Sequence, residues 1–263
     1  MVIKIHIYFL SKSEVNEDAA KYFILNLNKV QSYFEYHFIE TKGYLLKKNE
    51  VYSFEDLLEK FNKFIDKNHE QIKKIKGRDI ETADINIGII DSTLENNLYF
   101  AYDNKKAIIT VKDWKKSFYP PTVLEYLTSC IIQSTFYGLT NGLGSHWETS
   151  GCLFDYTYNK LDKKSGMCLG FICDKCKKLI DKKYIKCINS MMVNKWIGDP
   201  NSFGSVAFNL KKIYKIDINK DTGLEKTRWA KMKEFLLDAT KPVITDFLIL
   251  IITFIFGYIV GKF

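Results

Sequence analysis

The sequence predicts an α/β or α+β domain, with helices packed on a mixed sheet, followed by one C-terminal transmembrane helix. Short β-prone segments interleave with longer segments of helical periodicity, in the order β-α-β-α-β-β-β-α. Hydrophobic residues make up 46% of the 263-residue chain, which is enough for a sizeable core and excludes a disordered chain. The stretch 243–261 is almost uninterruptedly apolar, as expected of a membrane span.

The first part of the chain alternates strand and helix signals. Residues 3–10 alternate in polarity and are rich in Ile, Tyr and Phe, which predicts a strand. Residues 14–30 place apolar side chains at helical spacing, and the aromatic stretch 33–39 predicts a second strand. Ser53, with an acidic residue three positions later, is a capping signal for a long helix that ends at Gly77.

Three short strands and a helix complete the predicted domain. β-prone runs at 85–90, 98–102 and 107–111 are separated by turns that carry Asp, Asn and Lys. A helix then begins at Pro120–Pro121, since proline is tolerated in a first turn, and it stops before Gly142. This interleaved order predicts a single domain, which we place at residues 1–180.

Four metal-binding side chains follow this helix. His146 and Cys152 lie on one loop, and Cys173 and Cys176 form a Cys-x-x-Cys pair further along the chain. A Cys-x-x-Cys turn presents two thiolates from one tight loop, and four ligands of these types close a tetrahedral site. The sequence therefore predicts a structural Zn²⁺ in a zinc loop at 146–176.

Other roles for the cysteines stay open. Residues 156–170 are rich in Lys, Asp and Gly, as expected of a solvated loop between two ligand pairs. The Cys-x-x-Cys pair can instead be a redox pair, which usually follows a strand and opens a helix. Cys168 and Cys187 are candidate replacement ligands, whereas Cys130 lies in an apolar stretch and is expected in the core.

The C-terminal part of the chain predicts attachment to a membrane. Asp246 is the only charged residue of 243–261, and at about 1.5 Å per residue this stretch just crosses a bilayer core of about 30 Å. The alternative is a buried core helix. Residues 181–241, a basic and partly helical connector, hold 13 Lys+Arg and 7 Asp+Glu, a net charge of +6. The positive-inside rule then places the N-terminal domain in the cytoplasm.

Charge and cysteine usage limit the partners. The net charge of the chain is +8, but the lysines are scattered between aliphatic residues without an Arg-rich element, which disfavours nucleic-acid binding. The uneven cysteine spacing and the lack of a signal peptide indicate reduced thiols in the cytoplasm. In the apolar stretch, Gly257 and Gly261 form a G-x-x-x-G pair, which favours helix association in lipid and hence a homo-oligomer.

The order of elements and the zinc loop resemble the archaemetzincins, a family of metzincin zinc peptidases. That family runs from strand pairs like 85–90 and 107–111 into a helix carrying H-E-x-x-H-x-x-G-x-x-H, followed by cysteines that complete a structural zinc site. The resemblance covers roughly residues 1–180 and is carried mainly by the zinc loop. It matches the last His of the motif to His146, the second loop cysteine to Cys152, and the final pair to Cys173 and Cys176.

The chain departs from this family at the catalytic positions. Phe136, Tyr137 and Thr140 stand where the family has His, Glu and His, and Trp147 replaces the first loop cysteine. The chain has four histidines in all, and they are too dispersed to rebuild a three-His motif. The resemblance therefore implies a degenerate peptidase-like fold in which the last His has been recruited into the structural zinc site.

These observations favour a non-enzymatic, membrane-tethered zinc-binding adaptor, sensor or effector. Glu148 is expected to face solvent or support the ligands, since a closed four-ligand site leaves no water to activate. Asp91–Ser92 is expected to be a turn, because the serine has no matched histidine base. Two alternatives stay open. One is an active membrane-anchored hydrolase, namely a peptidase with an unrecognised site, and the other is a membrane-perturbing effector that assembles through its C-terminal helix.

Overall fold

The computed structural model describes residues 2–218, except 42, 48–49, 78–81, 115–120, 144–145, 147–149 and 157–159. Residues 1–225 form one compact unit, and the described residues all belong to it. No helix among these described residues has the length and hydrophobicity that a bilayer crossing requires. The predicted membrane segment 243–261 lies outside the described residues, so that prediction stays a prediction.

A five-stranded mixed sheet forms the centre of the unit, in the order β2-β1-β4-β7-β6. β1, β2, β4 and β7 are parallel, and β6 pairs with β7 in the antiparallel sense. The mixed sheet with packed helices confirms the predicted fold class. The strands are β1 (Ile3–Phe9), β2 (Phe34–Phe38), β4 (Ile85–Ile90), β6 (Phe100–Asp103) and β7 (Lys106–Thr110), and β3 (Val51–Tyr52) and β5 (Thr93–Leu94) form a separate small parallel sheet.

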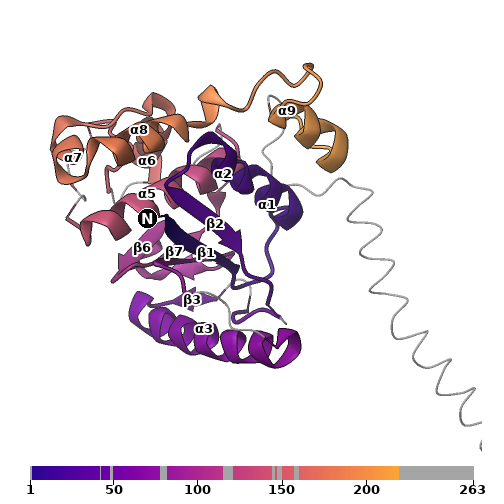
Figure 1. The fold of residues 1–263 in the computed structure, drawn as a ribbon. Coiled ribbons are helices and arrows are strands. Elements are labelled where there is room, and N and C mark those ends of the chain that lie inside the picture. Colours follow the sequence, from indigo (N-terminus) through magenta and orange to yellow (C-terminus); the bar gives the residue numbers. More distant parts are fainter. Residues whose placement is uncertain are drawn as a thin grey trace, which may run out of the picture. The chain divides into compact units, whose positions relative to one another are not determined.

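The two faces of the sheet bury separate cores. In β1, the side chains of Ile5 and Ile7 enter a core shared with the helices α1 (Glu17–Leu25) and α5 (Val123–Thr140). The alternate side chains, Tyr8 and Leu10, enter a second core shared with α3 (Phe54–Lys76). Figure 1 shows α1 and α5 on one side of the strands and α3 on the other. This alternation follows from the two-residue period of a strand, and it places α3 on the opposite face of the sheet from α1 and α5.

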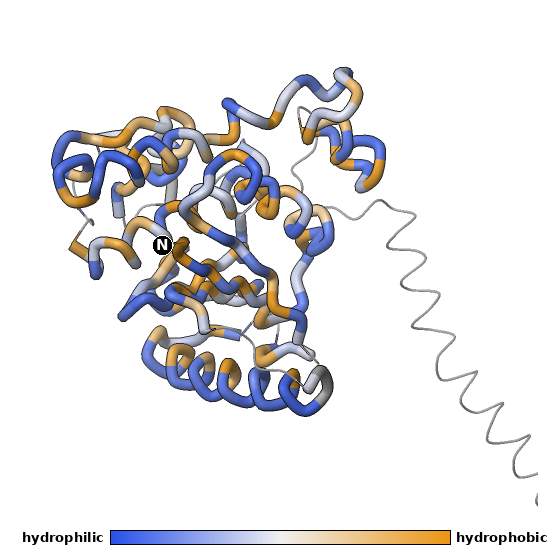
Figure 2. Tube along the Cα trace, in the orientation of Figure 1, coloured by the Kyte–Doolittle hydropathy of each residue, from blue (hydrophilic) through white to orange (hydrophobic). Residues whose placement is uncertain are grey.

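The ends of α3 follow the capping signals in the sequence. The Ser53 side chain accepts a hydrogen bond from the backbone of Asp56, and Gly77 ends the helix in the left-handed conformation, with φ of +63°. Glycine adopts this conformation at no steric cost. Figure 2 shows the hydrophilic outer surface of this amphipathic helix. The predicted bounds are confirmed at both ends.

The helix α5 begins at Val123 and not at Pro120–Pro121 as expected. Thr122 and Glu125 form a capping box, in which each side chain accepts a hydrogen bond from the other residue's backbone N–H. These reciprocal bonds satisfy two backbone N–H groups at the helix start, whereas a proline is only tolerated in a first turn. Nearly every residue of α5 is buried, as expected of a helix that is largely apolar on all sides.

Residues 156–170 were predicted to form a solvated loop, and this prediction is wrong. Residues Lys160–Leu169 form helix α6, and its Lys163 is fully buried. Further along, Ile188 and Leu210 enter the same core as α5. The remaining described helices are α2 (Leu27–Val30), α7 (Asp174–Leu179), α8 (Lys182–Ser190) and α9 (Val206–Asn209), with short helical turns η1 (Glu95–Asn97), η2 (Val193–Lys195) and η3 (Leu210–Tyr214).

Candidate metal centre

The structure brings the four predicted ligands together. The ligand atoms of His146, Cys152, Cys173 and Cys176 all lie within 4.8 Å of one another. Cys152 Sγ and Cys176 Sγ are 4.0 Å apart, and Cys173 Sγ is 3.5 Å from His146 Nε2. Among the described residues this is the one group of His, Cys, Asp and Glu side chains arranged to hold a metal ion.

The spacing of these atoms fits zinc. A tetrahedral Zn²⁺ with bonds of about 2.3 Å to sulfur and about 2.0 Å to nitrogen separates two sulfurs by about 3.8 Å, and a sulfur from a nitrogen by about 3.5 Å. The observed separations of 4.0 and 3.5 Å are close to both values. Three thiolates and one imidazole are also the donor set that structural zinc sites use. The His/Cys₃ cluster can therefore bind Zn²⁺.

Local backbone pairing positions each pair of ligands. His146 pairs with Asp155 in an isolated bridge, where the backbone N–H of Tyr156 donates to the His146 carbonyl at 3.1 Å. Cys152 pairs with Phe171 in a second bridge, which brings the first loop against the segment just before Cys173. These two bridges hold the ligand-bearing loops side by side without a regular sheet.

The Cys-x-x-Cys pair lies at the start of a helix. Cys173 is the N-cap of α7, and Cys176 lies in the first turn and is fully buried. A redox pair also opens a helix in this way. Cys152 and His146 converge on the same point, however, and a two-cysteine redox centre has no need of them. The convergence of four donors favours a metal site over a redox pair.

Asp155 is a functional residue that the sequence reasoning missed. Its Oδ1 lies 2.9 Å from His146 Nδ1, and its side chain is only 1% exposed. The backbone N–H and the hydroxyl of Ser150 also donate to this carboxylate. A carboxylate that accepts from Nδ1 leaves the Nε2 lone pair directed at the metal, the arrangement found around zinc-bound histidines. An acidic residue three positions after Cys152 was the only sequence signal for this role.

A buried polar network ties the zinc loop to α5. Lys163 Nζ donates to Gln133 Oε1 at 2.7 Å and to the Leu153 carbonyl at 3.0 Å. Gln133 Nε2 donates to the Tyr137 hydroxyl, which in turn donates to the Phe154 carbonyl. Burial lowers the pKa of Lys163 because it disfavours the charged amine. The loop that carries Cys152 is therefore anchored to the core by side chains of two helices.

Contacts within the cluster shift the pKa values of its thiols in opposite directions. The pKa of Cys152 is lowered, first by its contact with the Cys176 thiol at 4.0 Å and further because the Cys173 backbone N–H donates a hydrogen bond to the Cys152 sulfur. The same contact between the two thiols and burial raise the pKa of Cys176. The lowered pKa of Cys152 favours the thiolate form that metal ligation needs.

The helix positions that the archaemetzincin resemblance assigns to His, Glu and His are filled by core residues. Phe136 is fully buried and stacks on Phe154, with ring centroids 3.7 Å apart. Tyr137 and Thr140 are buried, and both hydroxyls are hydrogen-bonded to backbone carbonyls. These side chains support the loop by packing and hydrogen bonding.

The remaining candidate residues are placed as follows. Asp91 and Ser92 lie in the bend between β4 and β5, where Asp91 accepts from the Glu14 backbone and Ser92 donates to the Lys47 carbonyl, so the expected turn is confirmed. Cys130 is buried in the core as expected, and burial raises its pKa to about 11. Neither Cys168, which is exposed, nor Cys187 belongs to the ligand group; Trp147 and Glu148 lie outside the described residues.

Comparison with known proteins gives one distant likeness. No family model matches the chain, and no curated protein matches it. Among solved structures, archaemetzincin from Methanopyrus kandleri is similar with a TM-score of 0.39 and 14% sequence identity, over 70% of this chain and 96% of that chain. A likeness this distant decides neither the family nor the function, so the functional argument rests on the residues of this chain.

Proposed function

We propose that this protein is a non-enzymatic zinc-binding domain tethered to a membrane, which serves as an adaptor, sensor or effector. The observation that carries this proposal is the convergence of His146, Cys152, Cys173 and Cys176 on one point. Four protein ligands complete the tetrahedral coordination that Zn²⁺ prefers, so the metal acts as a structural cross-link.

The composition of the ligand set argues against metal-assisted hydrolysis. A catalytic zinc keeps one position open for water and needs a general base beside it. Here a fourth ligand, Cys152, occupies that position, and its sulfur is fully buried. The helix that would supply catalytic ligands in a metzincin presents Phe136 and Tyr137 to the core instead.

The zinc would contribute directly to folding. The ligands come from the loop that carries His146 and Cys152 and from the start of α7, and two isolated bridges hold these segments side by side. Structural zinc binding releases about 10–16 kcal/mol in small domains, which is comparable to the whole stability of a typical fold. Cys173→Ser in the full chain is therefore expected to abolish cooperative melting or cause aggregation. A variant that melts normally and keeps full zinc content would sink the ligand assignment.

Metal analysis combined with a peptide-library assay tests the non-enzymatic role. One tightly held zinc and no turnover are expected. A second bound metal, or clear cleavage, would favour the alternative of a membrane-anchored peptidase with an unrecognised site. If cleavage is seen, Glu148→Gln separates the cases: loss of activity at unchanged zinc content would assign this glutamate as a base and overturn the proposal.

Membrane tethering rests on the apolar stretch 243–261 and on the basic residues before it. Tethering predicts that the full chain sediments with membranes through carbonate extraction and that its N-terminal domain is digested by protease added from the cytoplasmic side. Release of the chain by carbonate would contradict the prediction of a transmembrane anchor. A second candidate, an effector that perturbs membranes, is favoured by Gly257 and Gly261. It predicts dye release from liposomes, which a plain anchor does not cause.

A further inference from the structure

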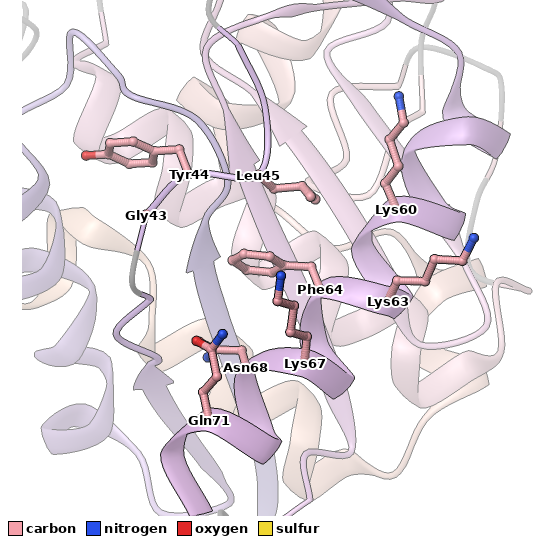
Figure 3. A pocket seen from close by; sticks show the side chains of 9 residues that line it. All are labelled: Gly43, Tyr44, Leu45, Lys60, Lys63, Phe64, Lys67, Asn68 and Gln71. Atoms are coloured by element: carbon pink, nitrogen blue, oxygen red, sulfur yellow. The ribbon is translucent and has the colours of Figure 1, made fainter. Parts of the chain in front are cut away.

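A cleft on the opposite side of the sheet from the zinc loop lies between α3 and the segment 43–45 that follows β2. It encloses about 420 Å³, a volume within the range of small-molecule sites. Figure 3 shows three lysine side chains extending from α3 and the Phe64 ring between this helix and segment 43–45. The lining residues are Gly43, Tyr44, Leu45, Lys60, Lys63, Phe64, Lys67, Asn68 and Gln71.

The charge of this cleft is of one sign. Its lining contains three lysines and no carboxylate. Lys63 pairs with Glu59, one turn earlier on α3, and the Lys60 amine lies 5.2 Å from the centre of the Tyr52 ring. Lys67 makes no ion pair with any described residue. Lysines three and four positions apart face the same side of a helix and repel each other, so this spacing favours a bound anion.

The other side chains of the cleft indicate the rest of the ligand. Phe64 is half-buried against the α3 core, and Tyr44 lines the cleft from the segment after β2. Aromatic faces pack well against a planar ring. Asn68 and Gln71, one turn apart on α3, add amide groups that can both donate to and accept from the edge of a heterocycle. Lysine ammonium groups are common phosphate binders, so phosphate is the anion that we assign to this cleft.

The geometry points to a binding site for a small phosphorylated molecule with a planar ring, of the mononucleotide class. Lys67 would hold the phosphate, Lys60 and Lys63 would add positive charge beside it, and Phe64 and Tyr44 would pack on the ring. Such a site gives the domain a ligand to sense, on a surface that shares no residue with the zinc cluster. Its occupancy therefore tests a property separate from zinc binding and from membrane attachment.

Calorimetric titration of the zinc-loaded full chain in detergent tests the assignment. The probes are the nucleoside monophosphates AMP, GMP, CMP and UMP, together with adenosine and inorganic pyrophosphate. At least one monophosphate is expected to bind more tightly than both partial probes, with an affinity that falls as salt rises. Absence of binding by all four monophosphates would overturn the proposal. Pyrophosphate binding as tightly as the best monophosphate would overturn the planar-ring assignment.

Matched variants locate the binding in the cleft. Lys67→Ala removes one charge-assisted contact and is expected to weaken the best monophosphate about tenfold or more. Lys74→Ala makes the same charge change on exposed α3 surface outside the cleft and is expected to leave the affinity unchanged. Phe64→Leu should weaken the monophosphate but not pyrophosphate. Equal affinities for Lys67→Ala and the original chain, with equal melting temperatures, would refute the site.

Discussion

Replacing Asp155 with asparagine tests how the zinc cluster is held, because it changes one buried carboxylate and no ligand. Asp155 accepts hydrogen bonds at both oxygens: Oδ1 faces His146 Nδ1 at 2.9 Å, and Oδ2 faces the Ser150 backbone N–H at 2.9 Å. Asparagine has one oxygen and one amide nitrogen. Either orientation of its side chain therefore directs an N–H group at a donor, which leaves a buried hydrogen bond unmade.

The expected effect follows from this geometry. The carboxylate side chain is 1% exposed, so solvent does not screen its interaction with the imidazole. Loss of such a partner lowers metal affinity about 10- to 100-fold, equivalent to about 1.4–2.7 kcal/mol. Because the His146 ring would also lose its fixed orientation, we expect the upper part of that range.

The assay is zinc competition with a chromophoric chelator of known affinity, run on the full chain and on Asp155→Asn. Asp174→Asn is the matched control, since it makes the same charge change beside Cys173, but its carboxylate is exposed and pairs with Lys177. Ser150→Ala, which removes only the longer hydroxyl contact of 3.2 Å, should give a smaller loss. Equal zinc affinities for Asp155→Asn and Asp174→Asn would refute the proposed role of Asp155.

Three further predictions concern the core, the thiols and the membrane segment. Lys163→Met leaves two buried acceptors without a donor and should lower the free energy of unfolding by about 2 kcal/mol or more, as urea denaturation would show; an unchanged midpoint would contradict this. Contact with the Cys176 thiol lowers the pKa of Cys152, which favours the thiolate form that a metal needs. Zinc binding displaces the remaining thiol protons, so the zinc affinity of the full chain should fall as the pH is lowered. Chelator competition at a series of pH values measures this, and an affinity that does not change with pH would contradict ligation by thiolates. Gly257→Leu combined with Gly261→Leu should reduce crosslinking of the chain in detergent; equal crosslinking of both forms would leave the segment a plain anchor.

Local signals allowed much of the fold to be predicted. The Ser53 cap and the Gly77 stop each act on the adjacent helical turn, so both can be recognised from the local sequence. The metal cluster was predicted for a similar reason, since ligand type and spacing are properties of the sequence. At α5 the prediction placed the helix start at Pro120–Pro121 and missed the capping box of Thr122 and Glu125, at which the helix in fact begins.

Residues whose roles depend on distant partners could not be predicted. Lys163 lies among Lys, Asp and Gly residues, a composition typical of solvent-exposed segments. Its burial depends on a hydrogen bond to Gln133, 30 positions earlier on α5. Asp155 gains its role because the loop folds back on itself and pairs Asp155 with His146 in an isolated bridge. The cleft beside the lysines of α3 could not be predicted either, since the segment 43–45 that forms its other wall is distant from them in sequence.

X-ray absorption spectroscopy at the zinc edge, on the full chain purified without added metal, tests the central claim most directly. The proposal predicts one zinc per chain, with three sulfur neighbours at about 2.3 Å and one imidazole nitrogen at about 2.0 Å. In His146→Ala the nitrogen shell should be replaced or the zinc lost. A spectrum with a zinc-bound water, or with mainly nitrogen and oxygen neighbours, would contradict a closed structural site and return the hydrolase to consideration.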